Sequence, residues 1–259
     1  MLSFGRRAKS EATRRNRKYP GGALGWKSEW MVNGDDPNLS PTVFLVEQPA
    51  NETLPAHFHL NNQFQLFIEG SGRIGARKVG PVTVHYAGAY TGYGPLIAGP
   101  EGMKYFTIRT VLEEGAQVIA CYEGKVPDGP RRHATSKPIE IKSAAEIAAL
   151  TTPEIVNAIE PAEDGLASAS VCLPAAANLA PMDLGTGEGL FLFVLAGTII
   201  VAGEVLGEWE SLYTGADDHF PLIVAGPEGA QVVTMIPPKR DPAYVMPSRA
   251  ELRLPTPAK

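Results

Sequence analysis

Two histidines and a glutamine lie close together within residues 55–70. His57 and His59 are two positions apart, and Gln63 follows four positions later. Because a β-strand points alternate side chains to the same face, a strand here would aim His57 and His59 at one point. Two imidazoles and an amide oxygen are ligands that suit a divalent first-row metal with open coordination positions. The segment therefore predicts a metal site, with iron, nickel, manganese or zinc as candidate ions.

The same pattern predicts the lining of a small-molecule pocket. If strand alternation continues from Gln63, then Gln65 and Phe67 face the same interior, although core packing is the simpler role for Phe67. Within residues 104–110, one face of the expected strand carries Tyr105, Thr107 and Arg109. An interior Arg109 could pair with a substrate carboxylate, whereas an exterior one would be an ordinary surface charge. The strand pattern does not decide between an interior and an exterior Arg109.

The elements that must hold these residues are short strands. The chain of 259 residues contains 27 Gly and 23 Pro, which suits strands joined by turns better than long helices. No alternation of strands and helices indicates a doubly wound sheet. Segments of high β-propensity recur between turns, chiefly at 42–47, 63–69, 72–76, 82–86, 104–110, 116–123, 189–201, 209–213, 222–224 and 231–236. The sequence therefore predicts an all-β sandwich or barrel.

Helical signals occur only near the middle of the chain. Ser143 and Glu146 have the spacing of a capping box, and Pro153 suits the first position of a second helix. Residues 125–137 are polar and read as a linker. We therefore expect a basic flexible tail at 1–20, a first barrel at 21–136, a helical linker at 137–164, a second barrel at 165–240 and a Pro-rich tail at 241–259.

The charges are unevenly distributed. Residues 1–20 carry seven Lys and Arg and only one acidic residue, Glu11, whereas the whole chain has a formal net charge of −5. Such an arm could bind nucleic acid or a membrane, or act as a transit-like peptide. No aromatic or base-reading pattern accompanies the charge, so we do not expect nucleic-acid binding. The simplest interpretation is a solvated arm that folds back on the acidic body or on a partner subunit.

The remaining composition points to the cytoplasm. No apolar run reaches the roughly 18 residues of a membrane span, and the N-terminus lacks the apolar region of a secretory signal. Cys121 and Cys172 lie far apart and outside any metal-type spacing, which favours free thiols in a reducing compartment.

An internal repeat divides the chain into two similar halves. The pentapeptide Ala-Gly-Pro-Glu-Gly occurs at 98–102 and again at 225–229, an offset of 127 residues. The same offset aligns Gly70 with Gly197, so two separate anchors agree on one register. At the metal cluster, the offset places Leu184, Thr186 and Leu190 opposite His57, His59 and Gln63. The second copy therefore has no metal ligands there, and we interpret it as a structural partner or an apolar pocket.

The histidine segment resembles the first motif of the cupin superfamily. It has His-x-His, three residues, Gln63 where most members have glutamate, six residues, and then Gly70. The resemblance covers roughly residues 40–125 and 165–237, and it implies two double-stranded β-helix (jelly-roll) barrels, as in the bicupins.

The second cupin motif is only partly present. Its expected spacing is matched by Gly80, Tyr86 in place of proline, and Gly88. Thr91 stands where the motif has a histidine ligand, so we expect Thr91 to line the substrate pocket and the third ligand to come from elsewhere. We rank Tyr90 first, because a one-residue bulge would turn it inward. His85, on the preceding strand, comes second, and His133, in the linker, comes last.

The resemblance implies function less directly than fold, because cupins include dioxygenases, isomerases, decarboxylases, epimerases, binding proteins and storage proteins. Glutamine in the first motif is similar to that of certain cupin dioxygenases. This implies a metal-dependent, dioxygenase-like oxidoreductase acting on a small organic molecule in the first barrel. The alternative is a non-catalytic cupin that binds a small molecule and keeps a vestigial metal site. Cupins often associate through sheet edges, so we expect a homodimer.

Overall fold

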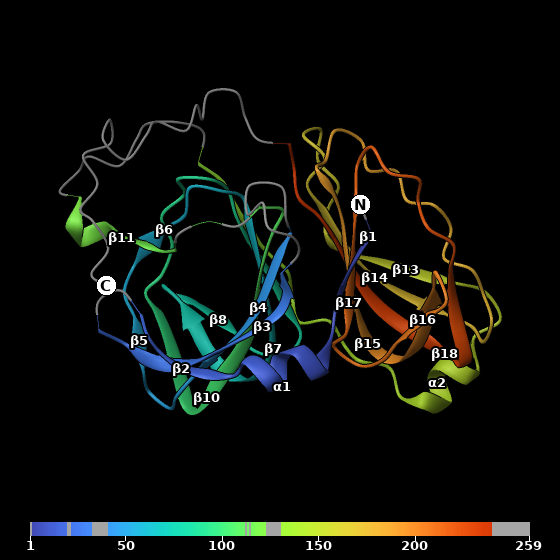
Figure 1. The fold of residues 1–259 in the computed structure, drawn as a ribbon, viewed down its shortest axis with the longest axis horizontal. Helices are drawn as coiled ribbons and strands as arrows, with labels where there is room; N and C mark the ends of the chain where they lie inside the picture. Colours follow the sequence, from blue (N-terminus) through green and yellow to red (C-terminus); the bar gives the residue numbers. More distant parts are fainter. Residues whose placement is uncertain are drawn as a thin grey trace.

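The protein is built from two antiparallel β-units that lie side by side (Figure 1). The structure, a computed structural model, describes residues 2–19, 22–32, 41–111, 113, 115–122 and 131–239. The predicted all-β jelly-roll class is confirmed, with regular helix confined to short segments of the described chain. No helix in this part of the chain has the length and hydropathy needed to cross a membrane.

The first unit contains a nine-stranded sheet and a two-stranded ribbon. The sheet order is β12-β9-β7-β10-β4-β3-β2, with β5 added on β10 and β8 on β7, and the ribbon joins β11 to β6. The strands are β2 (Arg15–Lys18), β3 (Leu24–Val32), β4 (Thr42–Gln48), β5 (Thr53–Leu54), β6 (His57–Phe58), β7 (Gln63–Ile74), β8 (Arg77–Val79), β9 (Thr83–Ala87), β10 (Leu96–Arg109), β11 (Gln117–Val118) and β12 (His133–Thr135). A 3₁₀ turn at Ile119–Cys121 follows β11, where the sequence had predicted a longer strand.

The second unit contains a seven-stranded sheet. Its order is β1-β17-β15-β18-β14-β13, with β16 added on β15. The strands are β1 (Leu2–Gly5), β13 (Glu154–Ile159), β14 (Ala167–Leu173), β15 (Gly189–Val201), β16 (Glu204–Leu206), β17 (Ser211–Gly215) and β18 (Ile223–Ile236).

The two units repeat one pattern, as the sequence predicted. The strands β8 and β16 begin at residues 77 and 204, and β10 and β18 begin at 96 and 223, so both pairs are offset by 127 residues. Gly70 and Gly197 both adopt positive φ, at 72° and 70°. A Cβ at either glycine would collide with a backbone carbonyl, of Gly102 in the first unit and Gly229 in the second. Both copies therefore need glycine at the same irregular point of the same strand pair.

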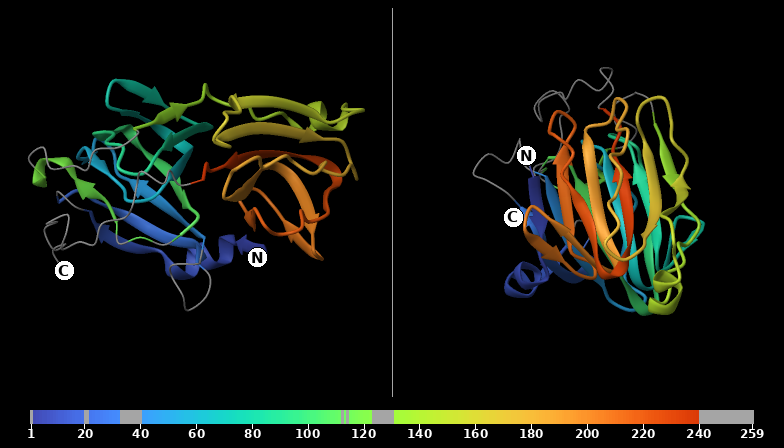
Figure 2. Two further views of the ribbon diagram at one scale, coloured as in Figure 1. Left: turned by 90° about the horizontal axis from the view of Figure 1, so that it is seen from above. Right: turned by 90° about the vertical axis from the view of Figure 1, so that its right-hand side faces the viewer.

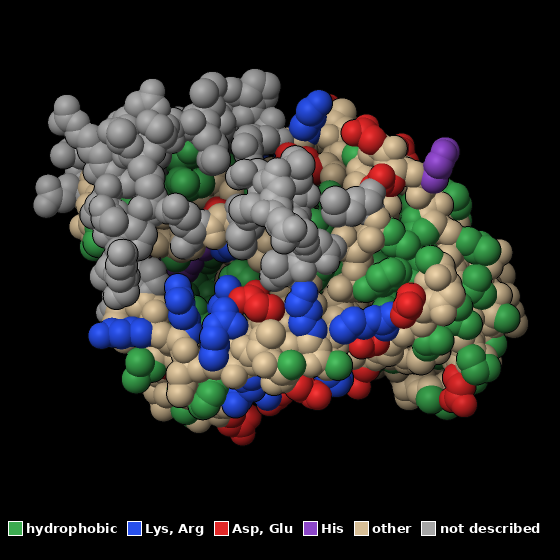
Figure 3. All heavy atoms as spheres, viewed as in Figure 1, with side chains coloured by type: hydrophobic (Ala, Val, Ile, Leu, Met, Phe, Trp, Pro, Cys, Tyr) green, Lys and Arg blue, Asp and Glu red, His purple; other side chains and the backbone are tan. Residues whose placement is uncertain are grey.

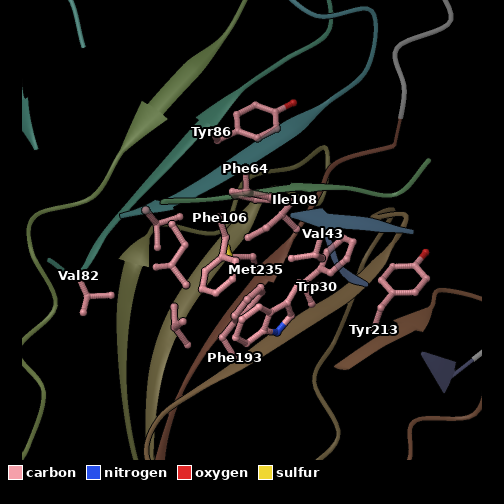
Figure 4. Close-up of a cluster of buried hydrophobic side chains, with 14 of the residues drawn as sticks. Trp30, Val43, Phe64, Val82, Tyr86, Phe106, Ile108, Phe193, Tyr213 and Met235 are labelled. Atoms are coloured by element: carbon pink, nitrogen blue, oxygen red, sulfur yellow. The ribbon is translucent and has the colours of Figure 1, made fainter. Parts of the chain in front are cut away.

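A shared hydrophobic cluster joins the facing sheets of the two units (Figure 4). The ring of Phe106 lies 4.8 Å from that of Trp30 and 5.0 Å from that of Phe193 in the second unit, measured between centroids. The strand β7 sends Phe64 and Leu66 into this cluster. Its alternate residues must then face the interior of the first barrel, and this alternation positions the candidate site.

The N-terminal segment bridges both units and is not the flexible tail predicted from its charge. The strand β1 pairs with β17 of the second unit, helix α1 (Arg7–Thr13) follows, and β2 pairs with β3 of the first unit (Figure 2). Leu2 and Phe4 pack against the second core. The basic side chains meet carboxylates of both units in the pairs Arg6–Glu204, Arg6–Glu210, Arg14–Glu47 and Arg15–Glu29. The segment thus folds back on the acidic body, which agrees with the simplest interpretation of its charge.

The predicted helical linker is only partly helical. Helix α2 (Ala144–Ala148) begins with the expected capping box between Ser143 and Glu146. The second predicted helix, at Pro153, is wrong, because β13 pairs there with β14. The β-branched pair Ile155 and Val156 favours this strand. The Pro-rich tail at 241–259 lies outside the described residues.

Candidate functional site

His57 and His59 lie inside the first barrel, on one side of the chain, as alternation predicted. Both side chains are buried, and their ring centroids are 5.2 Å apart. Phe58 points to the opposite side, where it packs with Tyr90 and Tyr122. On the face shown in Figure 3, a hollow opens in the first unit above a rim of Lys and Arg side chains, and histidine surface is visible within it.

Tyr93 is the neighbour of His57 across an antiparallel bridge. The two residues exchange backbone N–H···O hydrogen bonds of 3.0 Å each, which places their side chains next to each other. The Tyr93 hydroxyl lies 2.9 Å from His57 Nε2 and 2.7 Å from Gln63 Nε2. Tyr93 is not among the residues predicted from the sequence, because its place three positions after Tyr90 carries no motif signal.

The direction of these hydrogen bonds follows from what each atom can donate. His57 Nδ1 lies 2.8 Å from the carbonyl oxygen of Pro55, which can only accept, so Nδ1 carries the proton. The lone pair is then on Nε2 and accepts from the Tyr93 hydroxyl, which in turn accepts from the Gln63 amide. The imidazole of His57 therefore presents an unprotonated Nε2 to the barrel interior.

Glu113 fixes the tautomer of His59, as Pro55 does for His57. Its carboxylate is hydrogen-bonded to His59 Nδ1 and accepts from the backbone amides of Leu60 and Asn61, both at 3.1 Å. Because an ionised carboxylate only accepts, Nδ1 of His59 is the donor and Nε2 is unprotonated. Glu113 is likewise not among the residues predicted from the sequence, although its spacing of four residues from Arg109 was a possible signal.

Arg109 points into the barrel, which resolves the choice that the strand pattern left open. Its side chain is 3% exposed. Its Nε and Nη2 atoms donate to Gln63 Oε1 at 2.9 and 2.5 Å. Nη2 also lies 3.1 Å from His59 Nδ1, 3.3 Å from His59 Nε2 and 3.7 Å from the Glu113 carboxylate. A permanent cation therefore stands among the predicted ligand atoms.

Burial and charge together keep this cluster neutral. Burial lowers the pKa of His57 to about 3 and also lowers the pKa of His59, so both imidazoles are uncharged near neutral pH. Burial acts to raise the pKa of Glu113, but Arg109 and His59 outweigh it and hold this pKa at about 2. The single positive charge of Arg109 is thus balanced by the single negative charge of Glu113.

Gln65 and Phe67 face the same interior as Gln63, as predicted. Phe67 packs against Tyr105, with ring centroids 5.1 Å apart. Gln65 pairs across the sheet with His85, whose Nδ1 lies 2.8 Å from Thr135 Oγ1. The buried atoms Gln65 Oε1 and His85 Nε2 have no hydrogen-bond partner among the described residues. This part of the wall could therefore satisfy polar groups of a bound molecule.

The structure does not bring Tyr90 and Thr91 to the histidines. The Tyr90 amide donates to the carbonyl of His59 at 2.7 Å and its φ is 58°, so the chain turns the ring onto Phe58 instead of inward. The Thr91 hydroxyl accepts from the backbone amide of Arg132 at 3.0 Å, on the side of the linker. Their predicted roles as ligand and pocket residue are corrected accordingly.

His133 is exposed on β12, with its ring centroid 6.3 Å from that of His85. Its exposed side chain sets it apart from the buried pair His57 and His59.

Among its described residues, the second barrel offers no comparable cluster of histidine and charged side chains. Leu190, the counterpart of Gln63, is fully buried within an apolar strand. The interior of this barrel is a hydrophobic cluster that includes Val171, Leu192, Val194 and Val232. Among the residues that the structure describes, no three His, Cys, Asp or Glu side chains are grouped so as to hold a metal ion. A metal in the first barrel would therefore need Gln63, Tyr93 or exogenous ligands beside the two histidines.

Solved structures with a similar fold span most of the chain. A proposed dioxygenase from Nostoc punctiforme PCC 73102 matches with a TM-score of 0.59 at 12% identity, covering 95% of this chain and 81% of that one. A bacterial pirin from Escherichia coli in complex with nickel(II) matches with a TM-score of 0.52 at 13% identity, covering 92% and 99%. An oxalate decarboxylase variant from Bacillus subtilis matches with a TM-score of 0.54 at 12% identity, covering 93% and 78%. Neither a protein-family model nor a curated protein matches the sequence. At such low identity, these likenesses establish the fold alone.

Proposed function

Because the chain has the two-barrel fold of the cupins, we propose that its first barrel binds a divalent transition metal through His57 and His59. The observation that carries this proposal is the orientation of the two imidazoles. Each has its Nδ1 proton held, by Pro55 in one case and Glu113 in the other. Each therefore presents an unprotonated Nε2 inward, which is the state that a metal-ligating histidine needs.

The two histidines are suitable metal ligands. The third ligand is less readily available, because both candidate side chains already make hydrogen bonds. Two imidazole nitrogens with oxygen donors suit iron, nickel, manganese or zinc. Gln63 Oε1 accepts a hydrogen bond from Arg109, whereas the Tyr93 hydroxyl is already within 2.9 Å of the proposed ligand atom, His57 Nε2. Tyr93 therefore replaces Tyr90 as our candidate for an additional ligand.

We further propose that the first barrel acts on a small organic molecule, as a dioxygenase-like enzyme would. A bound ion of this class supplies Lewis acidity and, when redox-active, electron transfer to substrate or oxygen. The chain itself contributes orientation and exclusion of water. Glu113 and Pro55 fix the two imidazoles, and Phe67 and Tyr105 form an apolar wall in the same cluster as Tyr93. The proposed dioxygenase and the nickel-bound pirin among the structural neighbours support this choice of chemistry.

Metal binding can be tested by equilibrium dialysis of untagged, chelator-treated protein against nickel(II). We expect one ion per wild-type chain, and loss of this binding in His57→Ala and His59→Ala. His219→Ala is the matched control, because His219 is exposed in the second unit. Nickel binding that survives the loss of both barrel histidines would contradict the proposal. For the loaded protein, an oxygen-electrode screen with phenols and short carboxylic acids tests the oxygenase activity.

The second candidate function is non-catalytic binding of a small molecule. It is favoured by Gln65 Oε1 and His85 Nε2, two buried atoms without a partner among the described residues. Native mass spectrometry of metal-free protein distinguishes the candidates. A retained organic molecule that is lost in His85→Phe, together with unchanged binding in His57→Ala, would favour this second function.

A further inference from the structure

Arg109 lies against two of the candidate ligand residues of the first barrel, Gln63 and His59. Its Nη2 atom is 2.5 Å from Gln63 Oε1, and it lies 3.1 Å from His59 Nδ1 and 3.3 Å from His59 Nε2. A metal ligated by Gln63 Oε1 and His59 Nε2 would lie about 2 Å from each. The guanidinium and such an ion would then be within a few ångströms of each other.

The charges make joint occupancy unfavourable. A guanidinium does not lose its proton in proteins. Like charges repel strongly at such short range away from bulk water, since the effective dielectric constant is well below that of the solvent. Without a metal, by contrast, the single charges of Arg109 and Glu113 balance. The guanidinium also uses Gln63 Oε1 for two hydrogen bonds, so a metal must compete for that oxygen.

We propose that Arg109 is a positioning residue that sets the metal affinity of the first barrel. It holds Gln63 and His59 in a charge-balanced, metal-free arrangement, and a divalent ion binds only when the guanidinium moves away from Gln63. The metal of this protein is therefore weakly held and exchangeable. This inference rests on the proposed metal binding at His57 and His59.

Titration calorimetry with nickel(II) on the full, chelator-treated chain tests the inference. We expect Arg109→Gln to lower the dissociation constant at least about tenfold relative to the wild type, because the opposing charge is removed. Arg109→Lys keeps the charge but loses the planar fork on Gln63, so its dissociation constant should fall between the two. Arg109→Lys also keeps the test decisive if Arg109→Gln does not fold, as judged by circular dichroism.

Lys27→Gln is the matched control. Lys27 and Arg109 contact the ring of the same residue, Phe44, at 4.0 and 5.5 Å from its centroid. Lys27 pairs with Glu29 and makes no hydrogen bond to the histidine cluster among those between described residues. If Lys27→Gln strengthens nickel binding as much as Arg109→Gln, the effect is a general change in charge and the inference is overturned.

The remaining outcomes separate this inference from the proposed function. If the wild type binds nickel through His57 and His59, and neither Arg109 variant binds more tightly, the inference fails and the proposed function stands. If no variant binds nickel, or if binding in Arg109→Gln survives His57→Ala, the proposed metal site fails and the inference fails with it.

Discussion

The burial of His85 makes the stability of the protein depend on pH. This side chain is 3% exposed, and burial, with a smaller contribution from His133, lowers its pKa to about 3. In the unfolded chain, the pKa of histidine returns to about 6.5. Below pH 6.5 the unfolded state therefore binds a proton that the native state does not, so stability is lost as the pH falls.

The magnitude follows from this difference of one bound proton. Each such histidine lowers the free energy of unfolding by about 1.4 kcal/mol per pH unit between the unfolded and folded pKa values. From pH 6.5 to 4.5, His85 alone contributes a loss of between about 2 and 3 kcal/mol. His57 has the same low pKa and contributes similarly. Carboxylates that titrate below pH 4.5 do not contribute to this difference in stability between pH 6.5 and 4.5.

The assay is urea unfolding, followed by tryptophan fluorescence, at several pH values between 4.5 and 6.5. The variant His85→Gln should show a pH slope smaller than that of the wild type by about 1.4 kcal/mol per pH unit. Its absolute stability will also change, so the slope is the quantity to compare. The control His219→Asn alters an exposed histidine and should leave the slope unchanged. If the free energy of unfolding depends on pH equally in His85→Gln and the wild type, burial of His85 is not the cause of the pH dependence.

Four further predictions concern the fold. Phe193→Ala should lower the free energy of unfolding by about 3–5 kcal/mol, and both units should still unfold in one transition because they share this core; separate calorimetric transitions in the wild type would contradict this. Gly197→Ala should destabilise the protein by well over about 1 kcal/mol, since its φ is 70° and a Cβ would meet the backbone, and an unchanged melting temperature would argue against it. Ser143→Ala should reduce stability by about 1 kcal/mol through loss of the capping box, whereas Ser143→Asp should retain most of it in the same denaturation assay. The predicted homodimer fits an edge strand β13 that exposes Ile155 and Val156, and sedimentation velocity showing only a 27.6 kDa species at micromolar concentration would refute it.

The local sequence pattern was sufficient to predict most strands and the faces to which their side chains point. The two-residue period placed His57 and His59 together and turned Gln65 and Phe67 to the same interior. The offset of 127 residues identified two copies of one unit, and the same offset relates their strands in space. These features depend on neighbours within a few residues, or on similarity between distant segments, and both are visible in a linear sequence.

Only the tertiary structure decided which side chains complete the cluster. Tyr93 reaches His57 through an isolated antiparallel bridge to β6, and Glu113 reaches His59 from 54 positions further along the chain. The face of Arg109 was settled by the packing of the second unit against the opposite side of its sheet. The placement of β1 and Arg6 likewise depends on strand and charge partners about 200 positions away in the sequence. Strand register and sheet packing determine these long-range contacts, and the spacing of nearby residues alone does not reveal which distant side chains will come together.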